Sequence, residues 1–413
     1  MEKKEKHILF ISDNFPPEVN APATRTYEHC KEWVDAGMKV TVITCVPNFP
    51  KGKVFGGYKN KLYQKEYVDG IEVIRIWSYI SANSGFFKRV FDYISFAIMA
   101  FFTSFIVKKV DIVIATSPQF FSAVSGYFIG LFKRKPWIME VRDIWPESIR
   151  AVNAMKSSKV LDWLEKLELF LYKKAGKIIV VTDTFKDLIA SRGIDKEKIE
   201  VVKNGVYLDK FKPISKDLRL LSKLALRDKF VIGYIGTHGM AHKLGFILDA
   251  ITGMDENIHF LFIGDGSEKQ KLLLKKEKLG LKNITFIDFV SKQEIQKYIS
   301  ITDVALVPLK KSETFKTVIP SKIFENAAMQ KPVLLGVEGE SKKIIEKYKA
   351  GLCFVPENKD SFVMQLNRLY SDKALYERCQ KGCEDLAYDF NRKKKAMEML
   401  EIIRKTMEIK RNK

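Results

Sequence analysis

Cysteine is scarce in this sequence, with five residues among 413. Their number is odd, and no two of them have the Cys-x-x-Cys spacing that zinc sites and redox motifs use. Neither a zinc site nor a disulfide framework is therefore indicated. Cys379 and Cys383 lie four positions apart and are expected to share one face of a helix.

Several nucleotide and hydrolase motifs are also missing. The sequence has no Gly-x-x-x-x-Gly-Lys-Ser/Thr loop, no Gly-x-Ser-x-Gly elbow and no His-Glu-x-x-His helix. Gly264-Asp265-Gly266 is followed by Lys269 where a dinucleotide fingerprint needs its third glycine. These absences argue against ATP hydrolysis and NAD chemistry.

No two aspartates are separated by a single residue, so the usual carboxylate pair for a metal-bound nucleotide diphosphate is missing. His238 and His242 lie four apart, but no third ligand accompanies them. We therefore expect no metal and no other cofactor. Any diphosphate would be neutralised by lysines, arginines and helix ends.

The largely apolar run from Tyr93 to Val107 has fifteen residues, fewer than the roughly 20 that span a bilayer. It lies within residues 85–109, with Arg89 before it and Lys108-Lys109 after it. The segment is either a helix buried in the core or a basic, aromatic-rich helix that rests on an anionic membrane.

The formal charge of +21 predicts an anionic partner, and charge alone does not separate nucleic acid, anionic lipid and phosphorylated substrates. No nucleic-acid-binding module is visible, and nucleic acid is not expected. The apolar strand that starts at His7 is too short for the core of a signal peptide. We expect a cytoplasmic protein that is peripheral at the inner face of the plasma membrane.

The chain is longer than one hydrophobic core usually supports, and 46% hydrophobic residues suffice for two domains. Apolar runs alternate with helical patterns, which predicts parallel sheets covered by helices on both faces. Asp69-Gly70 is a strong hairpin signal within residues 63–77. The other strands are expected at 7–12, 39–44, 111–116, 136–141, 177–181, 199–203, 230–235, 259–263, 284–287, 304–307, 333–336 and 352–355.

A turn followed by a lysine-rich stretch marks a linker at residues 204–213. We predict a first domain at 1–208, a second at 209–385, and a C-terminal helix at 386–413 that packs back towards the first domain. Ligands of open α/β sheets bind beyond the carboxyl ends of the strands, so a cleft between two facing sheets is expected.

Pro320-Ser321-Lys322 opens a predicted helix between two buried strands. Unpaired amides at a helix start, a hydroxyl and an ammonium would together bind a phosphate. Glu325 follows one turn later, where its carboxylate can accept hydrogen bonds from two sugar hydroxyls. The segment therefore predicts a nucleotide site, the alternative being an ordinary amphipathic helix with a solvated glutamate.

Two further loops follow buried strands of the second half. Gly236 and Gly239 would let backbone approach a ligand, and Lys243 would reach a phosphate. Gly264 and Gly266 would border a base or ribose, unless they serve only the turn.

In the first half, the long loop at 13–25 has the length of a functional loop. The loop at 141–148 crowds an arginine, a tryptophan and two carboxylates into seven positions. We expect a site there, with an internal salt bridge as the alternative.

Together these loops resemble those of family 4 retaining glycosyltransferases with the GT-B fold. The resemblance spans essentially the whole chain. It rests on Phe15-Pro16-Pro17, Asn204-Gly205-Val206, 234–243, 264–266, 303–308 and 320–333. Residues 142–148 look closest to a bacterial branch that adds amino sugars, such as N-acetyl-fucosamine, in surface-polysaccharide assembly. The implied fold class is α/β, with two facing Rossmann-like, doubly wound parallel-sheet domains around a cleft.

The family carries a ribose-binding glutamate that matches Glu325, and diphosphate-binding groups that match Ser321, Lys322 and Lys243. The sequence departs from the family where Thr317 replaces a second glutamate and Thr237 an arginine; Glu313, His238 or Arg25 could compensate. The implied donor-binding set is Thr237, His238, Gly239, Lys243, Gly264, Gly266, Thr317, Ser321, Lys322 and Glu325.

The resemblance implies transfer of a sugar, such as an N-acetylated amino sugar, from a UDP-sugar to a polyprenyl-diphosphate-linked saccharide in capsule or O-antigen biosynthesis, with retention. Lys243 would stabilise the leaving diphosphate, and Asp143 and Glu147 would orient the acceptor or assist proton transfer. The acceptor-binding set is Asn20, Arg25, Arg142 and Trp145.

Two other functions remain open at this point. A nucleotide-sugar 2-epimerase also uses two facing α/β domains, and it needs no acceptor. A non-catalytic basic adaptor would bind anionic membranes or RNA.

Overall fold

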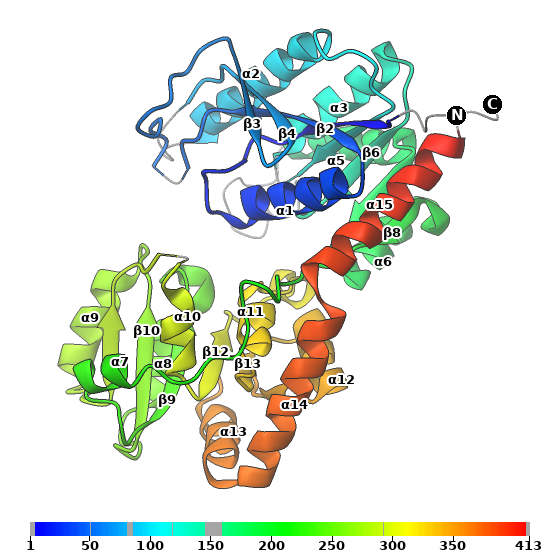
Figure 1. Cartoon of the computed structure of the whole chain (residues 1–413). Coiled ribbons are helices and arrows are strands. Elements are labelled where there is room, and N and C mark those ends of the chain that lie inside the picture. Colours follow the sequence, from blue (N-terminus) through cyan, green and yellow to red (C-terminus); the bar gives the residue numbers. More distant parts are fainter. Residues whose placement is uncertain are drawn as a thin grey trace. The chain divides into compact units, whose positions relative to one another are not determined.

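The computed structural model describes residues 5–49, 51–80, 86–117, 119–144, 159–291 and 293–409. The chain divides into two compact units, the first formed by residues 1–204 with 392–413 and the second by residues 205–391. Each unit is built on one mostly parallel sheet with helices packed on its faces (Figure 1).

The sheet of the first unit has eight strands in the order β3-β4-β2-β1-β5-β6-β7-β8, and only β3 and β4 pair antiparallel. Its strands are β1 (His7–Ile11), β2 (Lys39–Cys45), β3 (Tyr63–Val68), β4 (Ile71–Ile76), β5 (Ile112–Thr116), β6 (Trp137–Val141), β7 (Lys177–Val180) and β8 (Ile199–Val201). Its helices are α1 (Ala21–Asp35), α2 (Phe86–Ser104), α3 (Phe120–Phe132), α5 (Lys159–Lys174), α6 (Asp183–Ser191) and α15 (Arg392–Ile409), with a 3-10 turn at Lys196–Lys198.

Alternate residues of these strands enter two separate cores, as the period of a strand requires. Leu9 and Val113 face a core that contains α2, α3, α5 and α6. Ile8 and Ile114 face the opposite core, which contains α1 and α15. The last helix of the chain therefore completes the first unit. It contacts α1 through the buried Trp33, whose indole Nε1 donates a hydrogen bond to the carbonyl of Ala396 (2.8 Å).

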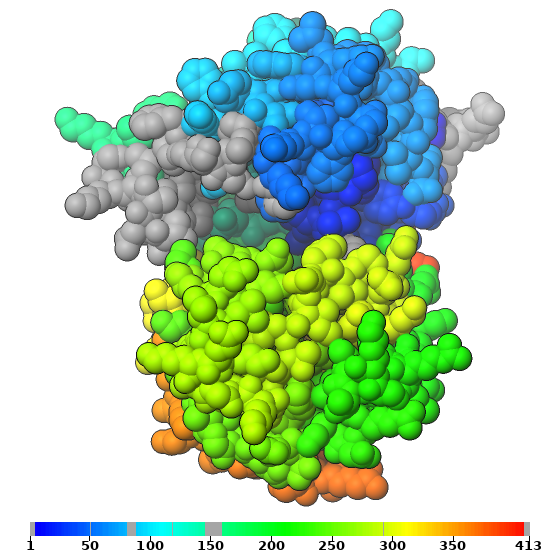
Figure 2. Space-filling view, turned by 90° about the vertical axis from the view of Figure 1, so that its left-hand side faces the viewer, coloured from blue at the N-terminus to red at the C-terminus, as the bar shows by residue number. Residues whose placement is uncertain are grey.

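The β3–β4 hairpin turns at Asp69 and Gly70, which both have positive φ angles, 48° and 81°. Two successive left-handed residues are what a tight two-residue hairpin needs, so the prediction at this point is confirmed. Residues of β3 alternate between exposed and half-buried. This segment, drawn in blue, forms part of the surface of the first unit (Figure 2).

The sheet of the second unit has six parallel strands in the order β11-β10-β9-β12-β13-β14. These strands are β9 (Phe230–Ile235), β10 (Ile258–Ile263), β11 (Ile284–Ile287), β12 (Val304–Pro308), β13 (Val333–Gly336) and β14 (Gly351–Cys353). The helices are α7 (Leu218–Lys223), α8 (Leu244–Ala250), α9 (Lys269–Lys278), α10 (Ile295–Ser300), α11 (Lys322–Ala328), α12 (Glu340–Tyr348), α13 (Lys359–Ser371) and α14 (Lys373–Asp389), with 3-10 turns at Met240–His242 and Thr314–Thr317.

The boundaries between the units lie after residues 204 and 391, not after 208 and 385 as predicted. The backbone N–H of Val206 donates to the carbonyl of Phe390 (2.9 Å), and Val206 also forms a β-bridge with Asn391. These contacts place the start of the second unit, near Val206, beside its end, near Asn391, so residues 205–208 and 386–391 all belong to that unit. The single helix predicted at 386–413 is instead the end of α14 and, beyond Asn391, the separate helix α15.

Helix α2 has one buried face and one exposed apolar face, so its packing in the core is confirmed and its contact with a membrane stays a prediction. Phe96 and Ala100 are buried, which places one face of the helix in the core. On the other face Ile98 and Phe102 are 51% and 63% exposed, and Phe105 beyond the helix end is 50% exposed. None of the helices in the described part of the chain has the length and apolar content to cross a membrane.

Arg25 of α1 and Glu140 of β6 form a buried ion pair, with 2.9 Å between Nε and Oε1. The other guanidinium nitrogens donate to the carbonyls of Val202 and Lys203 and to the side chain of Asn204. Burial opposes ionisation of Glu140, but the neighbouring arginines outweigh it and keep the pKa of this carboxyl below its usual value. The pair ties α1 to β6 and to the segment that follows β8.

We expect Glu140→Ala to lower the free energy of unfolding by about 3–5 kcal/mol, because it leaves the Arg25 charge buried without its partner. Urea unfolding followed by tryptophan fluorescence measures this loss. The exposed pair of Lys196 and Asp187 provides the control, because Asp187→Ala should cost less than about 1 kcal/mol. Equal effects of the two substitutions would contradict a structural role for the buried pair.

Candidate functional site

The strand order of the second unit reverses beside β9, because β10 follows on one side and β12 on the other. Ligands of such sheets bind outside the carboxyl ends of the strands at this reversal, beside the loops that leave β9 and β12. These loops span residues 236–243 and 309–321 and lead to α8 and α11. They carry most of the residues that the sequence predicts for donor binding.

Glycines hold the loops after β9 and β10 against each other. Gly264 and Gly266 have φ angles of 140° and 156°, which other residues rarely adopt. A Cβ atom on Gly264 would lie 2.0 Å from the carbonyl oxygen of Gly236, and one on Gly266 would lie 2.5 Å from that of His238. Only glycine therefore permits this close approach, which places the β10 loop directly beside the loop after β9.

Lys322, the first residue of α11, is the central group of the site. Its ammonium nitrogen is buried without a hydrogen-bond partner among the described residues, 4.0 Å from the centre of the Tyr234 ring. A Cβ atom on Gly236 would lie 2.8 Å from this nitrogen, so the glycine leaves room for it. Burial lowers the pKa of Lys322 to about 7, although nearby Glu325 acts to raise it. A desolvated ammonium at the start of the helix that follows β12 is suited to bind an anion.

Ser321 and Glu325 lie at the same end of α11 as Lys322. Ser321 is exposed directly before the helix, and its side chain makes no capping hydrogen bond. Glu325 is half-buried in the first turn. Thr317 ends the 3-10 turn upstream, where its hydroxyl donates to the carbonyl of Thr314 (2.8 Å). The structure thus brings together a hydroxyl, an ammonium and a carboxylate, the combination that the sequence predicts.

Lys243 stands directly before α8 with a left-handed backbone (φ 49°), and its ammonium lies 3.6 Å from the Glu357 carboxylate. Thr237 is exposed, and its carbonyl accepts a hydrogen bond from the Tyr234 hydroxyl (2.6 Å). Gly239 leads into the 3-10 turn. All three belong to the loop after β9, so a ligand bound there would meet Lys243 and backbone groups.

The position of His238 differs from the one its predicted donor-binding role requires. Its ring is fully buried against Tyr234, Phe262 and Phe286. Burial, with a contribution from Lys269, lowers its pKa to about 4, so the ring is neutral at physiological pH. His238 therefore has a structural role, because its ring packs the loop after β9 against the aromatic core of the second unit. The described part of the chain also contains no group of three His, Cys, Asp or Glu side chains that could hold a metal ion.

Arg25 was predicted to bind the acceptor because it lies in the loop after β1, and the structure corrects this assignment. The side chain is 1% exposed, and Glu140 and backbone carbonyls take up its donors. Asn20 caps α1, because its Oδ1 accepts a hydrogen bond from the N–H of Ala23 (2.8 Å). It remains half-exposed.

Arg142 and Asp143 directly follow β6. The Arg142 guanidinium donates to the carbonyls of Ala21 (3.1 Å) and Pro22 (3.3 Å), and burial lowers its pKa to about 9. It therefore holds the start of α1 against β6. Asp143 is half-buried, and its carbonyl accepts a hydrogen bond from the Ser117 hydroxyl (3.5 Å). The other two predicted residues of this loop, Trp145 and Glu147, lie outside the described residues.

A pocket of about 250 Å³, here called the carboxylate pocket, lies at the carboxyl end of β1, where the first sheet reverses its strand order. It is lined by Asp13, Asn20 and Asp92, among other residues. Burial raises the pKa of Asp13 to about 6, and burial together with Asp13 raises that of Asp92 to about 7. Carboxylates with such pKa values can accept hydrogen bonds or protons from sugar hydroxyls near neutral pH.

Sequence analysis does not select Asp92, because this residue stands directly before the apolar run at 93–107 and no motif includes it. One signal was available. Asp92 is the single acidic residue of α2, a helix that is otherwise apolar, polar uncharged or basic. An acidic side chain is unusual in a largely apolar helix, and its position in the lining of the carboxylate pocket accounts for it.

Comparison with known families accounts for both units. Residues 22–210 match the family described as Glycosyltransferase Family 4, and residues 221–384 match the family described as Glycosyl transferases group 1. Over 370 residues the chain is 23% identical to WcaI of Escherichia coli, named as a colanic acid biosynthesis glycosyl transferase, with 86% of this chain and 90% of that protein covered. It is 25% identical over 282 residues to the alpha-galactosylglucosyldiacylglycerol synthase of Streptococcus pneumoniae, with 61% and 72% covered.

The fold is similar to that of HepE from Anabaena, solved in complex with UDP and glucose. The TM-score is 0.71 at 15% identity, and the match covers 97% of this chain and 100% of that one. Two parallel-sheet α/β units, each matched to a glycosyltransferase family, define the architecture. The chain is a glycosyltransferase, and it belongs to family 4 with the GT-B fold.

Proposed function

We propose that this enzyme transfers a sugar from a UDP-sugar to a lipid-diphosphate-linked saccharide in the synthesis of a capsule or O-antigen, with retention. The observation that carries the donor half is the buried ammonium of Lys322, which has no hydrogen-bond partner in the part of the chain that the structure describes. In this reaction the bond between the anomeric carbon and the diphosphate oxygen breaks. A bond to an acceptor hydroxyl oxygen forms, and the hydroxyl proton leaves with the diphosphate or the solvent.

In this proposal Lys322 and Lys243 bind the diphosphate and stabilise the charge that develops as it leaves. Lys243 exchanges its contact with Glu357 for the diphosphate. Helix α11 has only seven residues, so we assign the charge to the lysines rather than to a helix dipole. Glu325 binds the ribose, and the Ser321 hydroxyl adds a diphosphate contact. With two ammonium groups present, the reaction as proposed needs no metal ion.

The acceptor binds to the first unit in this proposal. Its sugar hydroxyls enter the carboxylate pocket, where Asp13 and Asp92 accept hydrogen bonds. Asp143 and Glu147 are further candidates to orient the acceptor. The exposed apolar side chains of α2 rest on the inner face of the membrane, where a polyprenyl-linked acceptor is anchored.

The names of the relatives support this substrate class. WcaI is named for colanic acid biosynthesis, the pneumococcal relative for a diacylglycerol glycolipid, and HepE was solved with UDP and glucose. An N-acetylated amino sugar is supported by the resemblance of residues 142–148 alone. Membership of a transferase family favours this function over a 2-epimerase and over a non-catalytic adaptor.

Substitution of Glu325 tests the donor site. Wild-type enzyme is incubated with radiolabelled nucleotide sugars and membrane lipids, and label should pass to the lipid fraction from a UDP-sugar. Glu325→Ala should weaken UDP binding by roughly 10–100-fold in calorimetry, because a carboxylate loses its hydrogen bonds to two ribose hydroxyls. Turnover should fall with it.

The control is Glu346→Ala, which removes an exposed carboxylate from α12 of the same unit. If Glu325→Ala binds UDP and turns over as the wild type does, the donor site is assigned wrongly. Release of free sugar from donor alone would instead favour the epimerase, and the absence of any product would favour the adaptor.

The pKa of Lys322 predicts how donor binding depends on pH. Because the free ammonium titrates at about 7 and a bound diphosphate favours its charged form, binding above pH 7 requires proton uptake. UDP affinity should therefore fall by up to about tenfold per pH unit between pH 7 and 9. Of the groups nearby, His238 and His242 have pKa values of about 4 and stay neutral over this range.

Lys322→Met should bind UDP weakly and without this slope, whereas the exposed α12 substitution Lys343→Met should keep it. Calorimetry at three pH values separates these cases. A slope that survives in Lys322→Met would assign the titration to another group.

Asp92→Asn tests the acceptor half. We expect kcat/KM for the acceptor to fall by roughly 10–100-fold, because an ionised hydrogen-bond acceptor is lost, while the Kd for UDP stays unchanged. The wild-type rate should rise with pH through about 7, where Asp92 ionises, and the variant should lose this rise. Asp13, with a pKa of about 6, would account for any remaining rise at lower pH.

Asp35→Asn on the exposed face of α1 is the control. Unchanged acceptor kinetics in Asp92→Asn would refute its role.

A further inference from the structure

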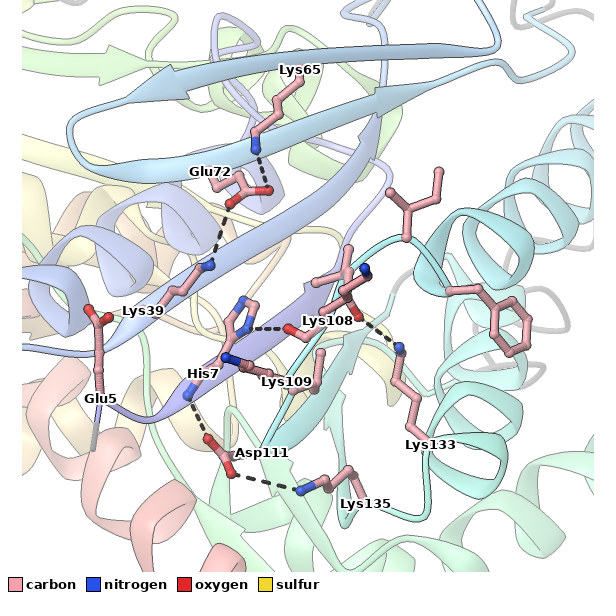
Figure 3. A pocket seen from close by; sticks show the side chains of 14 residues that line it. Glu5, His7, Lys39, Lys65, Glu72, Lys108, Lys109, Asp111, Lys133 and Lys135 are labelled. Atoms are coloured by element: carbon pink, nitrogen blue, oxygen red, sulfur yellow. Dashed lines mark hydrogen bonds and ion pairs between the residues drawn. The ribbon is translucent and has the colours of Figure 1, made fainter. Parts of the chain in front are cut away.

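A second large pocket lies at the opposite end of the first sheet. It has a volume of about 1030 Å³ and surrounds the amino ends of β1, β2 and β5, whereas the carboxylate pocket lies at the carboxyl ends. We call it the amino-end pocket. Figure 3 shows lysine side chains converging on it from four places: Lys39 on β2, Lys65 on β3, Lys108 and Lys109 before β5, and Lys133 and Lys135 after α3.

The acidic residues of the amino-end pocket neutralise only some of these lysines. Three carboxylates line the pocket, from Glu5, Glu72 and Asp111. Glu5 is exposed and forms no ion pair with a described lysine, whereas Glu72 pairs with Lys65 (3.0 Å) and Lys39 (4.0 Å). Asp111 lies 3.8 Å from Lys135, and it accepts a hydrogen bond from the backbone N–H of His7 (3.0 Å).

Three lysines have no carboxylate partner in the described part of the chain. Lys108 and Lys109 are exposed at the mouth of the pocket. Lys133 is half-buried and donates only to the carbonyl of Val107 (2.8 Å), and burial lowers its pKa. An excess of positive charge on partly desolvated groups favours an anionic ligand with several oxygen atoms, such as a phosphate.

An apolar groove of about 420 Å³ between α2 and α3 adjoins this pocket. Phe102 and Phe132 line the groove and are 63% and 60% exposed. Phe105, which lines the amino-end pocket, lies 6.3 Å from Phe132 between ring centres and 5.9 Å from the Lys133 ammonium. The apolar groove and the basic pocket therefore meet at the Phe105–Phe132 contact.

We propose that the amino-end pocket and the α2–α3 groove bind one anionic phospholipid, with its phosphate among Lys108, Lys109 and Lys133 and an acyl chain in the groove. A free phosphate would leave the apolar groove empty, and a zwitterionic lipid would not use the excess of lysines. The inference rests on the proposed membrane association and adds a specific ligand to it. The lipid is not the acceptor, because its site lies at the far end of the sheet from the carboxylate pocket.

Titration with monomeric lipid tests this site without a membrane surface. Short-chain dihexanoyl-phosphatidylglycerol, kept below its micelle concentration, should bind the full chain with one-to-one stoichiometry in calorimetry. The same lipid with a phosphatidylcholine headgroup, and inorganic phosphate, should bind at least about tenfold more weakly. The expected result is saturable binding of the phosphatidylglycerol with a higher affinity than that of the phosphatidylcholine or of inorganic phosphate.

The double substitution Lys108→Gln with Lys109→Gln should weaken phosphatidylglycerol binding by roughly tenfold or more, since each lysine contributes to attraction of the phosphate. Phe102→Ser should also weaken phosphatidylglycerol binding, because it removes an apolar side chain that lines the groove. The matched control, Lys278→Gln with Lys282→Gln, removes two exposed lysines of the second unit and lowers the net charge by the same amount. We expect it to leave phosphatidylglycerol binding unchanged.

Vesicle sedimentation separates the inference from the function on which it rests. If the wild type sediments with phosphatidylglycerol vesicles but does not bind the monomeric lipid, membrane association stands and the lipid site is refuted. If the wild type does not sediment with these vesicles, the proposed membrane association fails. Equal binding of phosphatidylglycerol by the lysine variant and its control would also overturn the lipid site.

Discussion

The parallel order of the strands determines where this protein can place chemistry. In a sheet built outwards from its first strand, crossover helices lie on both faces and close them, and only the strand ends remain accessible. In the second unit the strand order reverses beside β9, and Lys322 and Glu325 lie in the first turn of the helix that follows β12. In the first unit the corresponding reversal lies beside β1, and Asp13 and Asp92 line the pocket there. Two unrelated sets of side chains therefore occupy equivalent positions of two similar sheets.

The burial of the Lys322 ammonium is energetically unfavourable. An ammonium removed from water without a partner is unfavourable, and the protein accommodates it through the Tyr234 ring and the space beside Gly236. A depressed pKa is the consequence. A bound diphosphate would remove this penalty, so part of the unfavourable energy of burying the ammonium would contribute to affinity for such a ligand. Gly264 and Gly266 answer a different constraint, because a Cβ atom at either would clash with the backbone of Gly236 or His238.

The sequence was sufficient for the strands and for the α11 segment because both depend on local pattern. Buried parallel strands are short apolar runs, and Pro320-Ser321-Lys322 signals a helix start by itself. Arg25 was misassigned for the opposite reason, because its partner Glu140 lies 115 residues away and no local pattern reveals a buried ion pair. Asp92 was missed because its pocket is assembled from separate segments of the chain. The predicted boundary at 385 failed because the turn beyond α14 is held by a pairing between Val206 and Asn391, which is equally non-local.

Helix α2 links the two ends of the first sheet. Its first turns carry Asp92 into the carboxylate pocket, and the chain beyond its last residue brings Phe105 to the amino-end pocket. With a rise of about 1.5 Å per residue, the thirteen positions between these side chains correspond to about 20 Å. An acyl chain in the α2–α3 groove would lie along this helix. In the proposed function, the exposed apolar face of α2 would serve the membrane, and Asp92 near the start of the helix would serve the acceptor. This division would account for one helix that contains both a single carboxylate with a raised pKa and exposed phenylalanines such as Phe91 and Phe102.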